Sequence, residues 1–320
     1  MLKPARTLQR LYSGSLTGRY RISETPPRIN PAICRPFGHF TQVTSPLRQS
    51  NNMATTAEAA VQLVEQAKKA AASQAVKEHL LPTYRHIGIG SGSTVVYVVQ
   101  AIAALGRGVT DHMHFYSTGE QSATLITSAD LKLGFLRRLG DDVELDVCFD
   151  GADEVDDQLN LIKGGGACLW QEKIVVANSK KFICVVDHRK IGARLGTAWK
   201  QGIPIEVNPE SVPRVLKELR SIGSINPVLR RYEPAWRQVN VVTDNHQALI
   251  DAPFEPLLLP GDAEIGSPGR WTVDALATRL LGIVGVAEIG LFHGKVQKPA
   301  VVYIGLADGT TNFLTLPGSA

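Results

Sequence analysis

The sequence lacks long hydrophobic runs and has few cysteines. Among its 320 residues, the longest mostly apolar stretch runs from Val95 to Leu105, and Gln100 interrupts it. A membrane helix needs roughly 20 apolar residues, so we expect no membrane partner. The four cysteines show neither metal-site spacing nor the pattern of a disulfide framework, which fits a reducing compartment: Cys34, Cys148, Cys168 and Cys184.

The excess of basic over acidic residues is confined to the first 52 residues. The net charge is +4, but residues 1–52 hold eight basic residues and one acidic residue, a net +7, which leaves −3 for the remainder. A nucleic-acid footprint needs basic residues on the folded surface, so we expect no nucleic-acid partner. The Arg-rich leader is typical of a mitochondrial transit peptide. Alternatively, it is a disordered tail, or an extension upstream of a start at Met53. We expect a cytoplasmic protein, or a mitochondrial one if the leader directs import.

From residue 53 the chain alternates predicted helices and strands. Thr55 and Glu58 form a candidate capping box for a helix that Pro82 ends near Leu80. We predict strands at 86–89, 114–117, 143–149 and 182–186, and helices at 95–105, from 120 to 127 and at 167–179. This alternation favours βαβ units on a parallel sheet, an α/β, Rossmann-like domain.

The pattern changes after Pro204. We predict strands at 203–207, 225–232, 236–243 and 247–251, and a helix at 209–221. These suit a smaller α+β domain with an antiparallel sheet. A helix at 272–281 and strands at 286–292 and 300–304 follow, and loops are expected at 231–236 and 256–270. We therefore predict a leader at 1–52, an α/β catalytic domain at 53–204 plus 270–320, and an α+β insert at 205–269.

A glycine-rich segment, Gly88-Ile89-Gly90-Ser91-Gly92-Ser93-Thr94, follows a predicted strand and opens a helix. Amides at a helix N-terminus attract phosphate, and glycines let the backbone approach it. The hydroxyls of Ser91, Ser93 and Thr94 add donors. The spacing matches neither a Walker A loop nor a dinucleotide fingerprint, so a monophosphate site fits better. Alternatively, the segment is only a tight turn capped by Ser and Thr.

Acidic residues cluster after the strand at 143–149. Asp150 and Asp153 are three residues apart across a Gly-Ala turn, at the strand end where open α/β sheets bind ligands. Paired carboxylates can split their pKa values and perform acid–base chemistry. Alternatively, this is a solvated acidic turn, or a metal site built from hard oxygen ligands.

Two lysines follow at other strand ends. Lys163 precedes Gly164-Gly165-Gly166, whose amides can hold an oxyanion. Glu172 lies six residues beyond Gly166, within reach of the same pocket, although a helical glutamate is more often a surface residue. Lys190 follows the strand at 182–186 and could bind a phosphate or a hydroxyl; otherwise it is a solvated lysine. Together these groups suit proton transfer next to the carbonyl of a phosphorylated sugar.

In order and spacing, these segments resemble type A ribose-5-phosphate isomerases. The resemblance extends from about residue 58 to 316 and includes Pro204-Ile205-Glu206-Val207 and Val242-Thr243-Asp244-Asn245. It implies interconversion of ribose 5-phosphate and ribulose 5-phosphate through an enediolate, in the non-oxidative pentose phosphate pathway. It also implies no metal, no organic cofactor and a homo-oligomer, either dimer or tetramer.

The resemblance also implies roles for individual residues. Glu172 would be the general base, Lys163 and the glycine amides would stabilise the oxyanion, and Asp150 and Asp153 would assist ring opening and hydroxyl proton transfer. The implied substrate-binding residues are Ser91, Gly92, Ser93, Thr94, Gly164, Gly165, Lys190 and Lys68.

One position departs from the common family pattern, because Ser91 stands where Thr is usual; the hydroxyl is kept. Two other functions compete with the isomerase. One is another enzyme of related fold, such as a CoA transferase using Glu172 as nucleophile or an amino-sugar-phosphate deaminase. The other is a non-catalytic sugar-phosphate sensor, which would require a helix-turn-helix and a basic face.

Overall fold

A computed structural model describes residues 50–232 and 239–316, with side chains from residue 61 onward. The predicted leader therefore lies outside the described residues, except for its last three. Part of the predicted strand at 236–243 and of the predicted loop at 231–236 also lies outside them.

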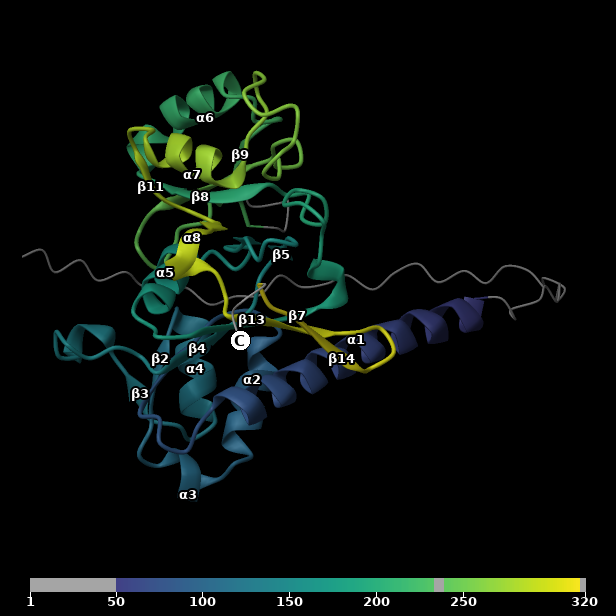
Figure 1. Cartoon of the computed structure of the whole chain (residues 1–320), viewed down its shortest axis with the longest axis vertical. Coiled ribbons are helices and arrows are strands. Elements are labelled where there is room, and N and C mark those ends of the chain that lie inside the picture. The colour runs from purple at the N-terminus through teal and green to yellow at the C-terminus, as the bar shows by residue number, and fades with distance from the viewer. Residues whose placement is uncertain (1–49, 233–238, 317–320) are drawn as a thin grey trace, which may run out of the picture. The chain divides into compact units, whose positions relative to one another are not determined.

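The main sheet has the strand order β14-β13-β7-β4-β1-β2-β3 (Figure 1). All neighbouring strands pair in parallel except β13 and β14, which pair antiparallel at one edge. The strands are β1 His86–Ile89, β2 His114–Ser117, β3 Leu133–Gly134, β4 Val147–Asp150, β7 Phe182–Asp187, β13 Val301–Gly305 and β14 Thr311–Leu314. The predicted parallel α/β fold is confirmed.

Helices cover both faces of this sheet because the strand residues alternate between two cores. In β7, Ile183 and Val185 pack with α1, α2 and α4, whereas Cys184 and Val186 pack with α5 on the other face. The helices on this sheet are α1 Ser50–His79, α2 Val95–Ala103, α3 Arg107–Thr110, α4 Glu120–Ser128 and α5 Leu169–Ala177. Cys184 is fully buried, as expected of a small core residue.

Helix α1 packs unusually close to the sheet. Its buried face is mostly alanine, which is the best helix former and has the smallest helix-favouring side chain. A Cβ at Gly305 of β13 would lie 2.3 Å from the Ala67 carbonyl oxygen, so only glycine fits there. The predicted N-cap at Thr55 is wrong, because the helix already begins at Ser50.

A second sheet is antiparallel, with the order β11-β8-β10-β9. Its strands are β8 Ile203–Val207, β9 Val228–Leu229, β10 Ala248–Ala252 and β11 Val286–Ile289, and helices α6 Val212–Ser221 and α7 Val273–Leu281 cover it (Figure 1). The predicted antiparallel α+β part is confirmed. The predicted strand at 225–232 is reduced to Val228–Leu229. Strands β11 and β13 both lie in the range 270–320 that we predict for the catalytic domain, but β11 pairs in the antiparallel sheet and β13 in the parallel one. The domain boundaries stay a prediction.

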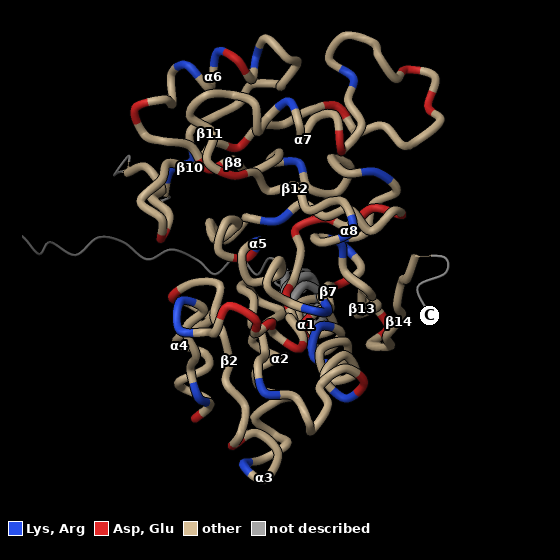
Figure 2. The backbone as a smooth tube through the Cα atoms, turned by 60° about the vertical axis from the view of Figure 1, so that its left-hand side comes forward, with Lys and Arg blue, Asp and Glu red and all other residues tan. Residues whose placement is uncertain are grey.

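A third sheet of two-residue strands was not predicted. It has the order β12-β6-β5, from Leu291–Phe292, Leu161–Ile162 and Glu154–Val155. Strands this short have no readable periodicity. A short helix, α8 Gly294–Gln297, and 3-10 turns at Leu136–Arg138, His188–Lys190 and Pro209–Ser211 complete the described elements. Acidic and basic residues are interspersed along both larger sheets and their helices (Figure 2). No described helix is long and apolar enough to cross a membrane.

Candidate active site

The site lies where the parallel sheet reverses its strand order. β1 has β2 on one side and β4 on the other, so the connections after β1 and β4 leave in opposite directions. In open α/β sheets, ligands bind at the carboxyl ends of the strands at such a point. A polar cleft of about 170 Å³ opens there. Its lining includes every predicted site residue except Asp150, which lies buried at the end of β4.

The loop after β1 fits closely against that buried aspartate. A Cβ at Gly90 would lie 1.8 Å from Asp150 Oδ1, so glycine is required by space. Asp150 Oδ1 accepts hydrogen bonds from the amides of Ser91, at 3.1 Å, and Gly151, at 2.7 Å. The aspartate therefore joins the ends of β1 and β4 into one rigid edge.

The same loop leads into α2 with hydroxyls and amides facing the cleft. Thr94 is the N-cap of α2, and its side chain makes no capping bond. Ser93 Oγ accepts a 3.0 Å hydrogen bond from Lys68 Nζ, and Lys68 is also paired with Glu65 at 2.8 Å. A helix N-terminus with an adjacent ammonium suits a phosphate group. The predicted grouping of Lys68, Ser93 and Thr94 is present in the structure.

Lys163 lies between two buried carboxylates. Its Nζ is 2.8 Å from Asp150 Oδ2 and 3.4 Å from Glu172 Oε1, and it donates a 2.6 Å bond to the Gly151 carbonyl. Burial raises the pKa of Asp150 to about 7; the Lys163 charge opposes this rise, and the Glu172 charge adds to it. Burial disfavours the charged form of Lys163, but the two carboxylates outweigh burial and raise its pKa.

Glu172 stands in the first turn of α5, with one carboxylate oxygen held and the other free. Oε1 accepts a 2.6 Å hydrogen bond from Ser91 Oγ. Oε2 is buried and has no hydrogen-bond partner within the described part of the chain. A buried carboxylate oxygen without a partner costs free energy. That cost is understandable where the oxygen must accept a proton from a ligand.

The glycine loop before α5 is shaped by contacts on two sides. Gly165 donates its amide to Asp153 Oδ2 at 2.6 Å, while the carbonyls of Gly164 and Gly165 accept bonds from Arg230 at 2.9 and 3.0 Å. Burial raises the pKa of Asp153, and the Gly165 amide opposes that rise. Ala167 has a φ of 63°, a left-handed conformation that is strained for alanine.

Cationic groups border the far side of the cleft. Lys190 Nζ lies 5.1 Å from the centre of the Trp199 ring, within cation–π range. Arg189 pairs with Asp187, its Nε 2.7 Å from Oδ1. Burial works to raise the pKa of Asp187, but the bonds and charge of Arg189 outweigh burial and lower it. Asp187 and Arg189 line the cleft without having been predicted as site residues, although they flank the strand end that led to Lys190.

Glu154, the residue after Asp153, holds the loop that carries Trp199 in place. Glu154 is fully buried, and its carboxylate accepts bonds from the amides of Gly196 at 2.6 Å, Thr197 at 2.8 Å and Ala198 at 2.6 Å. These bonds fix the loop that carries Trp199.

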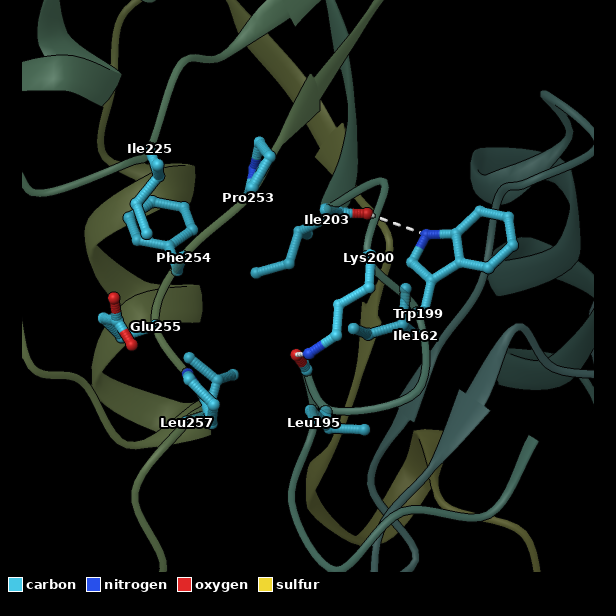
Figure 3. A pocket seen from close by; sticks show the side chains of 13 residues that line it. Ile162, Leu195, Trp199, Lys200, Ile203, Ile225, Pro253, Phe254, Glu255 and Leu257 are labelled. Atoms are coloured by element: carbon cyan, nitrogen blue, oxygen red, sulfur yellow. Dashed lines mark hydrogen bonds between the residues drawn. The ribbon is translucent and has the colours of Figure 1, made fainter. Parts of the chain in front are cut away.

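A separate apolar cavity of about 260 Å³ lies beside Trp199 (Figure 3). Ile203, Phe254 and Leu257 are among its walls, and Trp199 Nε1 donates to the Gly202 carbonyl at 2.9 Å. The cavity contains none of the predicted catalytic residues. The polar cleft is therefore the better candidate for the chemistry. Among the described residues, no group of three or more His, Cys, Asp and Glu is arranged to hold a metal ion.

Comparisons with known proteins identify the family of this chain. A family model described as ribose 5-phosphate isomerase A (phosphoriboisomerase A) matches residues 114–309. The chain is 43% identical over 250 residues to a ribose-5-phosphate isomerase of Candida albicans, covering 78% of this chain and 96% of that protein. It is 44% identical over 260 residues to one of Mycosarcoma maydis, covering 81% and 84%.

Solved structures give the same result. The chain is similar to a ribose 5-phosphate isomerase A from Methanocaldococcus jannaschii, with a TM-score of 0.64 and 30% identity, covering 78% of this chain and 99% of that one. It is also similar to a D-ribose-5-phosphate isomerase in complex with phospho-erythronic acid, with a TM-score of 0.66 and 32% identity, covering 79% and 99%.

Proposed function

We propose that Glu172 is the general base of the reaction that this chain catalyses. The chain belongs to the ribose 5-phosphate isomerase A family. It interconverts ribose 5-phosphate and ribulose 5-phosphate, a step of the pentose phosphate pathway. The observation that carries this proposal is the buried Oε2 of Glu172, which has no hydrogen-bond partner among the described residues. Its second oxygen is already fixed by Ser91. A base held in this way is oriented before the substrate arrives.

The proton transfer follows from this geometry. Glu172 Oε2 removes the proton from C2 of the open-chain aldose, and the electron pair moves onto the carbonyl oxygen at C1, which gives an enediolate. The same carboxylic acid then returns the proton to C1, while the hydroxyl proton at O2 passes to O1 and C2 becomes the carbonyl. We assign Asp150 and Asp153 to ring opening and to this hydroxyl transfer.

The developing negative charge requires donors and a positive charge. Lys163 lies 3.4 Å from Glu172 and has its Nζ surrounded by Asp150, Gly151 and Glu172. Its charge therefore acts on the enediolate without a large rearrangement. The glycine amides at 164–166 would supply the hydrogen bonds. Preorganised donors of this kind are usually the largest contribution to catalysis.

Substrate binding is assigned to the loop that leads into α2 and to two lysines of the cleft lining. The α2 N-terminus, with Ser91, Gly92, Ser93 and Thr94, would hold the phosphate together with Lys68 and Lys190. The reaction is proposed to need no metal and no organic cofactor. The test is an isomerase assay of the full chain on ribose 5-phosphate with EDTA present, run beside Glu172→Gln. Loss of activity in EDTA would refute metal independence. Full activity of Glu172→Gln would refute the assignment of Glu172 as the general base.

Assembly and location are further proposals. By its family, the protein is proposed to act as a homo-oligomer, either a dimer or a tetramer. Light scattering of the purified chain measures its mass, and the mass of a monomer would contradict this proposal. No nucleic-acid partner is proposed. We propose a cytosolic location, and a mitochondrial one would depend on the basic leader, residues 1–52. Fusing residues 1–52 to a fluorescent protein tests the mitochondrial alternative, which a diffuse signal would exclude.

A further inference from the structure

Arg230 connects the antiparallel sheet to the catalytic glycine loop. It follows β9, and its side chain is 13% exposed. Its Nε and Nη2 bind both oxygens of Asp251 on β10, at 2.8 and 2.5 Å. Its Nη1 donates to the carbonyls of Gly164 and Gly165. Its own backbone is fixed as well, since its amide donates to Leu249 and its carbonyl accepts from Val241.

These bonds help to set which way the loop amides point, together with the Ala167 amide, which donates to the Gly164 carbonyl at 3.0 Å. In a trans peptide, the carbonyl and the following N–H point in opposite directions, and the described chain has no cis peptide. With the Gly164 carbonyl on Arg230, the Gly165 N–H must face away, and it is bonded to Asp153. With the Gly165 carbonyl on Arg230, the Gly166 N–H must likewise face away from Arg230.

Gly166 itself lines the cleft. A Cβ at Gly166 would lie 3.6 Å from Ser91 Oγ, which places this residue next to the side chain that holds Glu172. The Gly166 N–H makes no hydrogen bond within the described ranges. It is a donor left available for a substrate oxygen.

We infer that Arg230, held by Asp251, is a positioning residue that orients the Gly165 and Gly166 peptides for catalysis. This inference rests on the proposed function and adds to it a residue outside the predicted site. Arg230 does not touch the phosphate-binding groups Lys68, Ser93 and Thr94. Removing the bonds of Arg230 to the Gly164 and Gly165 carbonyls should therefore lower kcat and leave KM nearly unchanged.

The decisive variant is the pair Arg230→Met with Asp251→Leu, in which no charge is left buried without a partner. We expect kcat to fall about tenfold to a hundredfold, as for a misplaced catalytic group, with KM within about twofold because the phosphate groups remain oriented. Arg279→Gln is the control, since Arg279 forms a half-exposed pair with Glu218, away from the loop. It should keep wild-type kcat.

Chemical rescue separates positioning from a general loss of fold. Guanidinium ion added to Arg230→Ala, far below denaturing concentration, should restore part of kcat, and methylammonium at the same concentration should not, because only the planar fork can bond a carboxylate and two carbonyls. A folded double variant with wild-type kcat, or no recovery with guanidinium, would overturn the inference. Inactive wild-type protein would instead count against the proposed function.

Discussion

The Ser91 hydroxyl donates a 2.6 Å hydrogen bond to Glu172 Oε1, between residues 81 positions apart in the chain. Both side chains are buried. The bond comes from the loop after β1 and reaches the first turn of α5. It fixes the carboxylate plane, so that Oε2 is the oxygen left to exchange a proton.

The first prediction concerns Ser91. Ser91→Ala should lower kcat about tenfold, because a net hydrogen bond to a charged group is worth roughly 1.5–3 kcal/mol and part of that holds the base in position. Ser91→Thr is the matched variant, since it keeps the hydroxyl. It should retain nearly full kcat. Steady-state kinetics of both proteins decide the matter, and equal losses in the two would exclude a role for the hydroxyl.

The second prediction concerns the base. Glu172→Gln keeps the size and the acceptor oxygen for Ser91 but cannot take a proton, so kcat should fall by about 10²–10⁴. The thermal midpoint should be measured beside it, to show that the variant is folded. A matched control is Glu288→Gln, which alters a half-buried carboxylate outside the cleft lining; this carboxylate binds Lys173, the neighbour of Glu172 on the same helix. Near-wild-type turnover of Glu172→Gln would remove Glu172 from its assigned role.

The third prediction concerns pH and stability. Burial raises the pKa of Asp150 to about 7, whereas an unfolded aspartate titrates near pH ~4. Between these values the native state keeps a proton that the unfolded state has lost. The stability contributed by the protonated form is fully present below about pH 4 and is lost as the pH rises to about 7, by up to about 1.4 kcal/mol per pH unit.

Asp150→Asn isolates this contribution because asparagine does not titrate. The free energy of unfolding of the wild type minus that of the variant should fall from about pH 4 to about pH 7 and level off above. Urea unfolding at several pH values measures it. A difference that rises with pH would show that the native pKa is lowered, with Lys163 outweighing burial.

The fourth prediction concerns the cationic rim. Lys190→Ala should raise KM for ribose 5-phosphate about tenfold with a small change in kcat, because one charge-assisted contact to the substrate is lost. Trp199→Leu should shift KM in the same direction but less, since it removes the ring beneath Lys190 and leaves the lysine itself in place. If Lys190→Ala lowered kcat and left KM unchanged, Lys190 would belong to the chemistry instead.

The sequence was most informative where local pattern and local chemistry coincide. β1 and β8 have the predicted bounds, and the strand-end positions of Asp150 and Lys190 indicate the edge of the sheet at which the polar cleft lies. The sequence pattern predicts that Gly90 lets the backbone approach a phosphate, but in the structure Asp150 leaves no room for a side chain at this position. That constraint depends on pairing between β1 and β4, which no local pattern contains.

Contacts between segments that are distant in the chain cannot be predicted from local pattern, for the same reason. Arg230 bonds carbonyls 65 and 66 positions earlier, and nothing in its neighbours signals this. The role of Glu154 is similar: it follows Asp153 in the acidic segment, yet it binds amides more than 40 positions later. Spacing along the chain shows which residues can share a strand end, but not which backbone groups a buried charge will satisfy.

The strand order has a consequence for how activity appears during folding. Because β4 pairs with β1 across the intervening β2 and β3 segments, the site requires contacts of long sequence separation, which form slowly. Local helices such as α1 and α2 can form earlier, when Ser91 and Glu172 are still far apart. Regain of isomerase turnover after dilution from denaturant should therefore lag behind the helical circular dichroism signal. The recovery of turnover would then report when β1 and β4 pair in the sheet.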